Sequence, residues 1–281
     1  MDFERIRYDT PAEHIARITL NRADKANAQD AKMLYEIDRA LTQAAQDDAI
    51  RCIMIAADGK NFSAGHDLKD RETPADHDPV TLWAGFDEPG QAGQMSTEHE
   101  MYLGLCWRWR NLPKPTIVQV QGQCIAGGLM LVWPFDIVIA SEDAQFSDPV
   151  VAFGVNGHEY FTHVWEVGHR KAKEMLFTGA SFTAEECRQL GMVNHVVPRE
   201  ELDDFTLAMA KRIAKRPMIG LRLAKLACNQ SLDAQGQWTA IQAAMGWQQV
   251  GHANARINFG RPIDPAGVEA IRSDMQESQE K

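Results

Sequence analysis

The chain has 281 residues and, with 29 lysine and arginine against 39 aspartate and glutamate, a formal net charge of −10 at pH 7. Its 44% hydrophobic and 24% charged residues are typical of a globular protein long enough to fold around its own core. An acidic surface repels phosphate backbones and no basic patch is visible, so we expect no nucleic acid partner.

Three features bear on cellular location. The five cysteines are scattered and form no C-x-x-C pair, which predicts free thiols, no structural zinc and the reducing cytoplasm. The N-terminus lacks the basic and apolar segments of a signal peptide. The most apolar region, 117–140, contains Pro134, Asp136 and two central glycines, so we expect buried elements there and no membrane span.

The first sixty residues predict the order strand, strand, helix, strand. Residues 3–8 and 14–20 are rich in isoleucine and threonine, which is typical of strands. Asp30 opens a run of apolar residues spaced at threes and fours through about Asp47, which predicts a helix. The apolar run at 51–57 is typical of a strand buried on both faces.

The middle of the chain contains a long polar excursion. Residues 58–68 form a glycine-containing loop, and residues 69–98 are polar with several prolines. Because this stretch also holds aromatic side chains, which a disordered linker usually lacks, we interpret it as a loop that covers a pocket. A helix is predicted over 98–110 and a buried strand over 116–120.

The second half of the chain becomes helical. The run IAGGLMLVW predicts a helix entered through glycines, and strands are predicted at 135–140 and 192–197. Residues 200–258 predict three helices, separated near Pro217 and around 229–233. Their large apolar side chains either fold back on the core or cover a neighbouring subunit, and we favour an oligomer.

These elements predict a layered α/β core, residues 1–200, followed by a helical C-terminal region, residues 201–281. Several common sites are excluded by missing spacings: the chain has no G-x-x-x-x-G-K-[ST], no G-x-G-x-x-G after a strand and no H-E-x-x-H. Ser63 lacks the G-x-S-x-G context of serine hydrolases. We interpret the adjacent Asp76, His77 and Asp78 as a solvated run and expect no metal site.

Two glycine turns remain, Ser-Ala-Gly at 63–65 and Ala-Gly-Gly at 126–128. Each follows a buried strand and leads into a predicted helix, whose first N–H groups are unpaired and partially positive. If the turns face each other, two peptide N–H groups converge on one carbonyl oxygen and stabilise charge there as an oxyanion hole. The pattern leaves a second reading equally open, in which both are tight strand-to-helix turns.

Six segments occur in a characteristic order: NRADKANAQD at 21–30, FSAGHDL at 62–68, QGQCIAGGLML at 121–131, AQFSDP at 144–149, LFTGASFTAEECRQLGMVNHVVP at 176–198, and the helical C-terminus. In this order they resemble the crotonase (enoyl-CoA hydratase/isomerase) superfamily over about residues 5–255. The resemblance implies an α/β, crotonase-like spiral of repeated β-β-α units with a C-terminal helical trimerisation region. It also implies a homotrimer or a dimer of trimers.

The resemblance further implies an acyl-CoA substrate, with coenzyme A as part of the substrate and no separate cofactor. The thioester oxygen would be held by the N–H groups of Ala64 and Gly127. The other residues implied in coenzyme A binding are Lys25, near the phosphates, and the stretch that receives adenine and pantetheine, Ala28, Ala64, His66 and Leu68.

The sequence departs from the family at two positions. Typical hydratases carry two glutamates that position a water and move its proton, and their positions here are Met130 and Val150, neither of which accepts a proton. The nearest substitutes are His158 and Glu159 in the turn GVNGHEY. The family resemblance implies that an acidic residue in this turn is the catalytic base in relatives that isomerise, dehalogenate or hydrolyse. The alternative is that both are solvent-facing loop residues.

We therefore expect an enzyme of the enoyl-CoA hydratase/isomerase type that stabilises a thioester enolate, with Glu159 or His158 handling protons. Two rival hypotheses stay open. One is a non-catalytic acyl-CoA-binding protein that kept the pocket, and the other is a crotonase-fold isomerase or C–C hydrolase that uses the same two residues.

Overall fold

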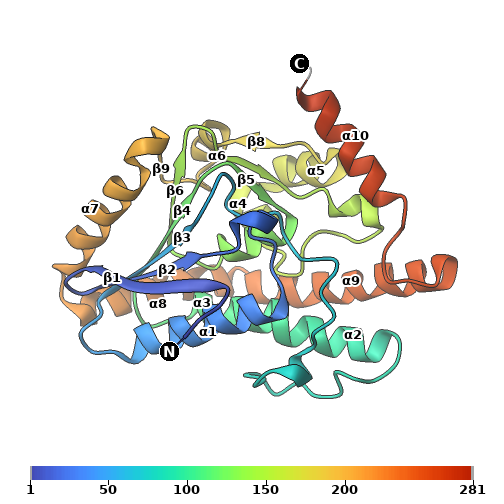
Figure 1. Ribbon diagram of the computed structural model, residues 1–281, viewed down its shortest axis with the longest axis horizontal. Coiled ribbons are helices and arrows are strands. Elements are labelled where there is room, and N and C mark those ends of the chain that lie inside the picture. Colours follow the sequence, from blue (N-terminus) through green and yellow to red (C-terminus); the bar gives the residue numbers. More distant parts are fainter. Residues whose placement is uncertain (1, 280–281) are drawn as a thin grey trace.

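A computed structural model describes residues 2–279, with side chains through residue 273. Figure 1 shows a central twisted sheet with helices on both sides, and this six-stranded sheet has the order β1-β2-β3-β4-β6-β9. All its pairs are parallel except β1 with β2. Its strands are β1 Ile6–Ala12, β2 Ile15–Leu20, β3 Cys52–Ala57, β4 Thr116–Val120, β6 Ile137–Ser141 and β9 His195–Val197.

A second, three-stranded sheet lies beside the first and has the order β5-β7-β8, with strands β5 Gln123–Ile125, β7 Gln145–Ser147 and β8 Phe182–Thr183. The α-helices are α1 Ala31–Gln46, α2 Gln91–Glu98, α3 Leu105–Arg110, α4 His163–Val167, α5 His169–Thr178, α6 Ala184–Leu190, α7 Leu202–Ala214, α8 Met218–Ala234, α9 Gln237–Phe259 and α10 Gly267–Gln279. Short 3-10 helices include η1 Ala23–Lys25, η2 Pro74–Asp76, η4 Ala126–Leu131, η5 Val150–Phe153 and η6 Arg199–Glu201.

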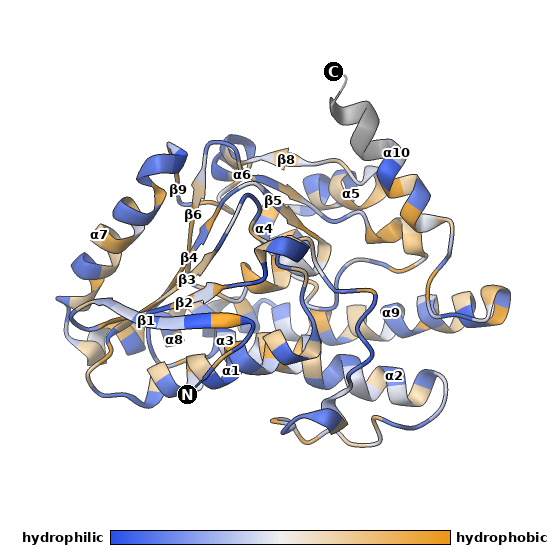
Figure 2. Ribbon diagram, viewed as in Figure 1, coloured by the Kyte–Doolittle hydropathy of each residue, from blue (hydrophilic) through white to orange (hydrophobic). Residues whose placement is uncertain are grey.

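The sheet is buried on both faces because successive residues of its strands enter two different hydrophobic clusters. Ile53 and Ile55 of β3 pack in the larger cluster with α1 and α3, while Cys52 and Met54 pack in the smaller cluster with α7. This alternation explains why the predicted strands read as continuous apolar runs. Figure 2 shows the outer helices α7 and α9 alternating between hydrophilic and hydrophobic residues, as expected for helices with one solvated side.

The crotonase-like α/β fold is confirmed, and several predicted elements are closely matched. Helix α1 begins after Asp30, whose side chain accepts a hydrogen bond from the Met33 N–H and so caps the helix as predicted. The predicted strand at 116–120 is β4. Of the described helices, none is long and apolar enough to cross a membrane.

Three expectations on element boundaries are wrong. The helix predicted from Glu98 begins at Gln91, because α2 continues through a π-helical segment, His99–Gly104, into α3. The glycines at 127 and 128 do not open an α-helix, since Ala126–Leu131 forms a 3-10 helix after Ala126 turns the chain with φ at 51°. The break predicted at 229–233 lies at Gln235 and Gly236, and α10 was not predicted.

Candidate active site

The two predicted glycine turns lie against each other. The Ile125 N–H donates to the Ser63 carbonyl over 3.0 Å, and Ser63 and Cys124 form a parallel bridge. A Cβ added at Gly65 would lie 2.8 Å from the Ile125 carbonyl oxygen and 3.3 Å from the Gly127 nitrogen. Only glycine allows this approach, so Gly65 is required for the two turns to meet.

The Ala64 N–H is not available to a ligand. It donates to the Ala26 carbonyl over 2.9 Å, because the turn that contains Ala26 and Asn27, both with positive φ, is tied to the 58–64 loop. The Asn27 side chain completes this tie by donating to the carbonyls of Asp58 and Asn61. The expectation that Ala64 supplies one of two converging donors is therefore wrong.

The His66 N–H, two residues further on, is differently placed. Gln29 pairs with His66 in a parallel bridge in which the Gln29 N–H donates to Gly65 and the Asp67 N–H donates to Gln29, both over 2.8 Å. The His66 N–H therefore points to the other side of this short strand, and it has no hydrogen-bond partner within the described part of the chain. Gly127 is the second residue of η4, where a helix leaves its N–H groups unpaired.

The side chain of His66 forms a pair with Glu159 beside these N–H groups. The His66 Nε2 lies 3.2 Å from Glu159 Oε2, and the Gln248 Nε2 donates to Glu159 Oε1 over 3.4 Å. The Tyr102 ring stacks on the imidazole with ring centroids 4.1 Å apart. Burial, and secondarily the Glu159 charge, raises the pKa of Tyr102 well above its usual value. Glu159 is thus a buried carboxylate beside the two turns and not a solvent-facing loop residue.

A second acid–histidine pair lies nearby, between α2 and α9, which run side by side in Figure 1. The His252 Nε2 lies 3.0 Å from Glu98 Oε1, and its Nδ1 donates to the Pro262 carbonyl over 2.7 Å. Burial opposes ionisation of Glu98, but hydrogen bonds from His252, Gln94 and Gln249 outweigh it and lower the pKa of Glu98. Burial also opposes the charge on His252, and Glu98 outweighs it and raises the pKa of His252.

Both pairs line one cavity of about 710 Å³, a volume within the usual range of small-molecule sites. One wall is polar and comes from α2, the π-helical segment, α9 and the turns. The other wall comes from η5, Val155 and the chain from 262 into α10, and it is apolar except for Arg272. The polar wall contains His66, Gln94, Glu98, Tyr102, Glu159, Gln248 and His252, and the apolar wall contains Val150, Phe153, Val155, Pro262, Ile263, Val268 and Ile271.

A wider groove adjoins this cavity and shares Ala64, His66 and Leu68 with it. Lys25 and Ala28 line the groove, together with the further cations Arg5, Arg22, Lys69 and Arg71 and the carboxylates of Asp30, Asp67, Asp70, Glu72 and Asp76. Arg5 and Arg22 are engaged by carboxylates, whereas Lys25 and Lys69 take part in no ion pair with the described residues. The five predicted binding residues are therefore gathered in one place, next to the cavity.

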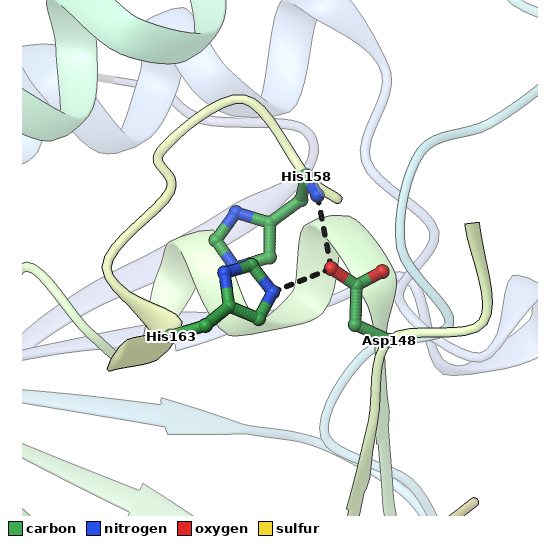
Figure 3. Close-up of side chains that lie close together, drawn as sticks. All are labelled: Asp148, His158 and His163. Atoms are coloured by element: carbon green, nitrogen blue, oxygen red, sulfur yellow. Dashed lines mark hydrogen bonds and ion pairs between the residues drawn. The ribbon is translucent and has the colours of Figure 1, made fainter. Parts of the chain in front are cut away.

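His158 lines the same cavity as Glu159, and its ring packs against Trp133 and His163. Figure 3 shows its ring beside that of His163, while its backbone N–H donates to Asp148 Oδ2 over 2.9 Å. The same oxygen lies 2.7 Å from His163 Nε2, and all three residues are buried. Burial, reinforced by His163, holds the pKa of His158 well below its usual value, so its imidazole is neutral near pH 7. His158 is thus a neutral neighbour of the site.

Asp148, His158 and His163 offer ligand atoms within 4.8 Å of one another. A separation of 2.7 Å between His163 Nε2 and Asp148 Oδ2 is that of a hydrogen bond. We therefore interpret these residues as a buried hydrogen-bonded cluster, in which ionised Asp148 fixes the ring of His163. Burial opposes this ionisation, and the hydrogen bond from His163 with the nearby imidazoles outweighs it, which lowers the pKa of Asp148.

Comparison with known proteins identifies the family of the chain. The family model described as enoyl-CoA hydratase/isomerase matches residues 10–258. The chain belongs to this family of enzymes. The putative enoyl-CoA hydratase EchA13 of Mycobacterium tuberculosis is 41% identical over 261 residues, which cover 90% of this chain and 82% of the relative. The 1,2-epoxyphenylacetyl-CoA isomerase of Escherichia coli is 32% identical, over 79% of this chain and 82% of the relative.

Solved structures agree. A probable enoyl-CoA hydratase from Mycobacterium thermoresistibile superimposes with a TM-score of 0.84 at 49% identity, covering 92% of this chain and 99% of the other. A probable enoyl-CoA hydratase from Mycobacterium smegmatis superimposes with a TM-score of 0.84 at 47% identity over the same shares of the two chains. The superfamily predicted from the six ordered segments is thereby confirmed.

Proposed function

We propose that this protein binds an acyl-CoA thioester and stabilises its enolate, with the thioester oxygen accepting hydrogen bonds from the His66 and Gly127 N–H groups. The free His66 N–H and the amide at the start of η4 support this pair of donors. Removing one such donor costs about 3 kcal/mol of transition-state stabilisation in enzymes where it has been measured. This role replaces the one expected for Ala64.

Glu159 is the proposed base. A carboxylate that removes a proton from C2 of an unsaturated acyl group generates an enolate, and the same carboxylic acid can return the proton to C4 as the double bond moves into conjugation. The His66 imidazole orients Glu159 through their 3.2 Å contact, and His158 contributes no proton because it is buried and neutral. The single observation that carries this proposal is the placement of the His66 and Glu159 pair beside the two N–H groups.

This site favours isomerisation over hydration. Hydration needs a water held between two proton-accepting groups, but Met130 is 1% exposed within the core and Val150 contributes to the apolar wall. Neither side chain accepts a hydrogen bond from an attacking water. With one carboxylate at the reacting position, we propose an isomerase of acyl-CoA double bonds.

Coenzyme A is proposed to occupy the groove that adjoins the cavity. Its phosphates need cations, and Lys25 and Lys69 supply them in an otherwise acidic protein. The exposed backbone at Ala64 and Leu68 would contact adenine and pantetheine, as the family resemblance implies.

A homotrimer, or a dimer of trimers, is proposed for the assembly. Helices α8 and α9 expose a series of large apolar side chains that a lone subunit would leave in water: Ile219, Leu223, Leu226, Trp247, Val250, Ile257 and Phe259. Large apolar side chains exposed in this number are typical of a subunit interface.

The proposed function is tested by exchange of the C2 protons of hexanoyl-CoA in D₂O, followed by NMR, because exchange reports enolate formation without requiring the natural substrate. We expect exchange with the native protein and at least a hundredfold slower exchange with Glu159→Gln. Glu200→Gln, at an exposed position in η6, serves as the matched control. In parallel, 3-hexenoyl-CoA should gain the absorbance of a conjugated thioester.

Other outcomes identify the rivals. Micromolar binding of hexanoyl-CoA with no exchange would establish the binding protein and overturn the enzyme proposal. Loss of absorbance from crotonyl-CoA through water addition would establish a hydratase. Release of a carbon fragment from the acyl group would establish a C–C hydrolase.

A further inference from the structure

The imidazole of His66 is enclosed on both of its faces. The Tyr102 ring stacks on one face, with the ring centroids 4.1 Å apart and the planes inclined by 25°. Gly127 lies over the other face, because a Cβ placed there would be almost equally distant from the ring atoms Cε1, Nε2 and Nδ1. At the edge of the ring, Nε2 meets Glu159 Oε2 over 3.2 Å. The stack therefore fixes the direction in which the imidazole presents Nε2 to the carboxylate.

Tyr102 is held in this stack by the backbone that carries it. It belongs to the π-helical segment His99–Gly104, a wide helical turn of a kind that is frequent at functional sites. Only glycine fits at position 104, because an added Cβ would lie 2.6 Å from the carbonyl oxygen five residues earlier. The buried carboxylate of Glu100 accepts the N–H groups of residues 80 and 81 over 2.6 and 3.0 Å, which ties the segment to the neighbouring loop. The position of Tyr102 is therefore set by its helix as well as by the stack.

The part of Tyr102 that contacts His66 is a neutral ring. Burial, and then the charges of Glu159 and Glu98, raise the pKa of the Tyr102 hydroxyl well above its usual value, so the phenol keeps its proton near neutral pH. The hydroxyl forms no hydrogen bond with a described residue. Stacking depends on the flat face of the ring, which a phenyl group offers as well as a phenol does. The ring and the hydroxyl can therefore be tested separately.

An imidazole released from the stack would misplace the proposed base. Turning the ring about its bond to Cβ would carry Nε2 away from Glu159 Oε2, leaving the longer hydrogen bond from Gln248, 3.4 Å, to hold the carboxylate. A displacement of about 1 Å at a catalytic site costs up to about a hundredfold in rate.

We propose that Tyr102 is a positioning residue of the reaction. Its ring closes the His66 imidazole in against Gly127, and the imidazole in turn holds Glu159 at the place where it takes up the proton. This inference rests on the proposed function, which makes Glu159 the base. It assigns to a helix distant in sequence from the two turns the task of aligning the groups that the turns carry.

The test separates the ring from the hydroxyl by proton exchange on hexanoyl-CoA in D₂O, measured over a range of thioester concentrations. Tyr102→Leu removes the flat ring, so we expect the maximal rate to fall by about tenfold or more, while the half-saturating concentration changes by less than about threefold. Tyr102→Phe keeps the ring and should stay within about threefold of the native protein in both values. Trp83→Leu is the matched control, because it removes a ring stacked on His99, with centroids 4.1 Å apart, outside the lining of the cavity. It should change neither value.

An NMR measurement reports the stack itself and needs no turnover. An aromatic ring shifts the signals of protons held over its face to higher field, so the ring protons of His66 should be shifted in the native protein and in Tyr102→Phe. This shift should disappear in Tyr102→Leu and persist in Trp83→Leu.

Two results would overturn the inference. The first is a Tyr102→Leu protein that has lost the shift of the His66 signals but still exchanges protons at the native rate. The second is a Tyr102→Phe protein whose rate falls as far as we expect for Tyr102→Leu, which would assign the effect to the hydroxyl and does not require Tyr102→Leu to fold. Failure of the proposed function gives a different pattern, in which the native protein shows the shift of the His66 signals but exchanges no protons.

Discussion

The imidazole of His66 lies directly on Gly127. A Cβ placed on Gly127 would fall 2.6 Å from the ring Cε1 and 2.8 Å from Nε2, closer than side-chain atoms approach. The same ring is held from its other sides by Tyr102 and Glu159. The absence of a side chain at position 127 therefore fixes where the imidazole sits as well as giving access to the peptide N–H.

Gly127→Ala tests this relationship. The added methyl must displace the ring from Glu159, so we expect proton exchange on hexanoyl-CoA to slow by about a hundredfold, a loss comparable to removing an oxyanion donor. In a His66→Ala background there is no ring to displace, and the further loss from Gly127→Ala should fall below tenfold. Equal losses in both backgrounds would show that the two residues act independently.

The Glu98 and His252 pair should make stability depend on pH. Glu98 has a lowered pKa, so its contribution is present above its ordinary value of 4.5 and is lost as the pH falls through the folded-state value. His252 has a raised pKa, so its contribution is present below 6.5 and is lost as the pH rises through the folded-state value. Between pH 4.5 and 6.5 both contributions are present, and there we expect His252→Gln to cost about 3 kcal/mol of unfolding free energy.

That difference between native protein and His252→Gln should shrink as the pH rises through the folded-state pKa of His252, where the native imidazole loses its proton. Urea unfolding at several pH values measures it. Lys171→Gln, which removes an exposed pair with Glu174, is the control and should cost less than 1 kcal/mol at every pH. A pH-independent cost for His252→Gln would show that His252 acts through packing alone.

Asp148→Asn should destabilise the fold beside the site. It leaves the buried His163 ring without its charged acceptor, and breaking a buried pair in this way costs about 3 to 5 kcal/mol. Because the Asp148 pKa is lowered, the native advantage is present above 3.8 and disappears as the pH falls through the folded-state value. Chemical unfolding measures the cost, with Asp143→Asn, in an exposed pair with Arg199, as the control.

The exposed apolar residues of α8 and α9 should hold subunits together. Leu223 and Leu226 are 57% and 54% exposed in the single chain, so Leu223→Arg together with Leu226→Arg places two charges in the proposed interface. Sedimentation should show a trimer or hexamer for the native protein and a smaller species for the double variant. A native monomer would remove the proposed assembly.

How far the sequence predicted the site depended on how local each signal was. The glycine turns and the acidic residue of GVNGHEY are contiguous motifs, and the sequence alone placed them. The wrong donor, Ala64, arose because the pairing of Ala26 with Ala64 is a contact between two loops that no local pattern reveals. The choice between adjacent N–H groups depends on the direction of the backbone, which a motif does not specify.

The side chains of the polar wall were missed for a related reason. Tyr102, Gln248 and His252 come from helices distant in sequence from the turns, and they meet Glu159 only in the folded chain. One signal was present, since Gln248 and His252 lie four residues apart on α9 and so share one side of that helix. The sequence does not show that this side of α9 faces the cavity that contains Glu159, so the spacing alone could not assign the two residues to the site.

The two walls of the cavity belong to different segments, the polar one to α2, α9 and the turns and the apolar one to η5 and the chain from 262 into α10. Gly267 packs so closely on Phe153 that an added Cβ would lie 2.5 Å from the phenyl ring, which couples α10 to η5. Selection could therefore alter the bulk of the accepted acyl group by changing residues 262–271 while the side chains contributed by α2 and α9 stay unchanged. Relatives with the same reaction could therefore diverge in the carbon skeleton that they accept.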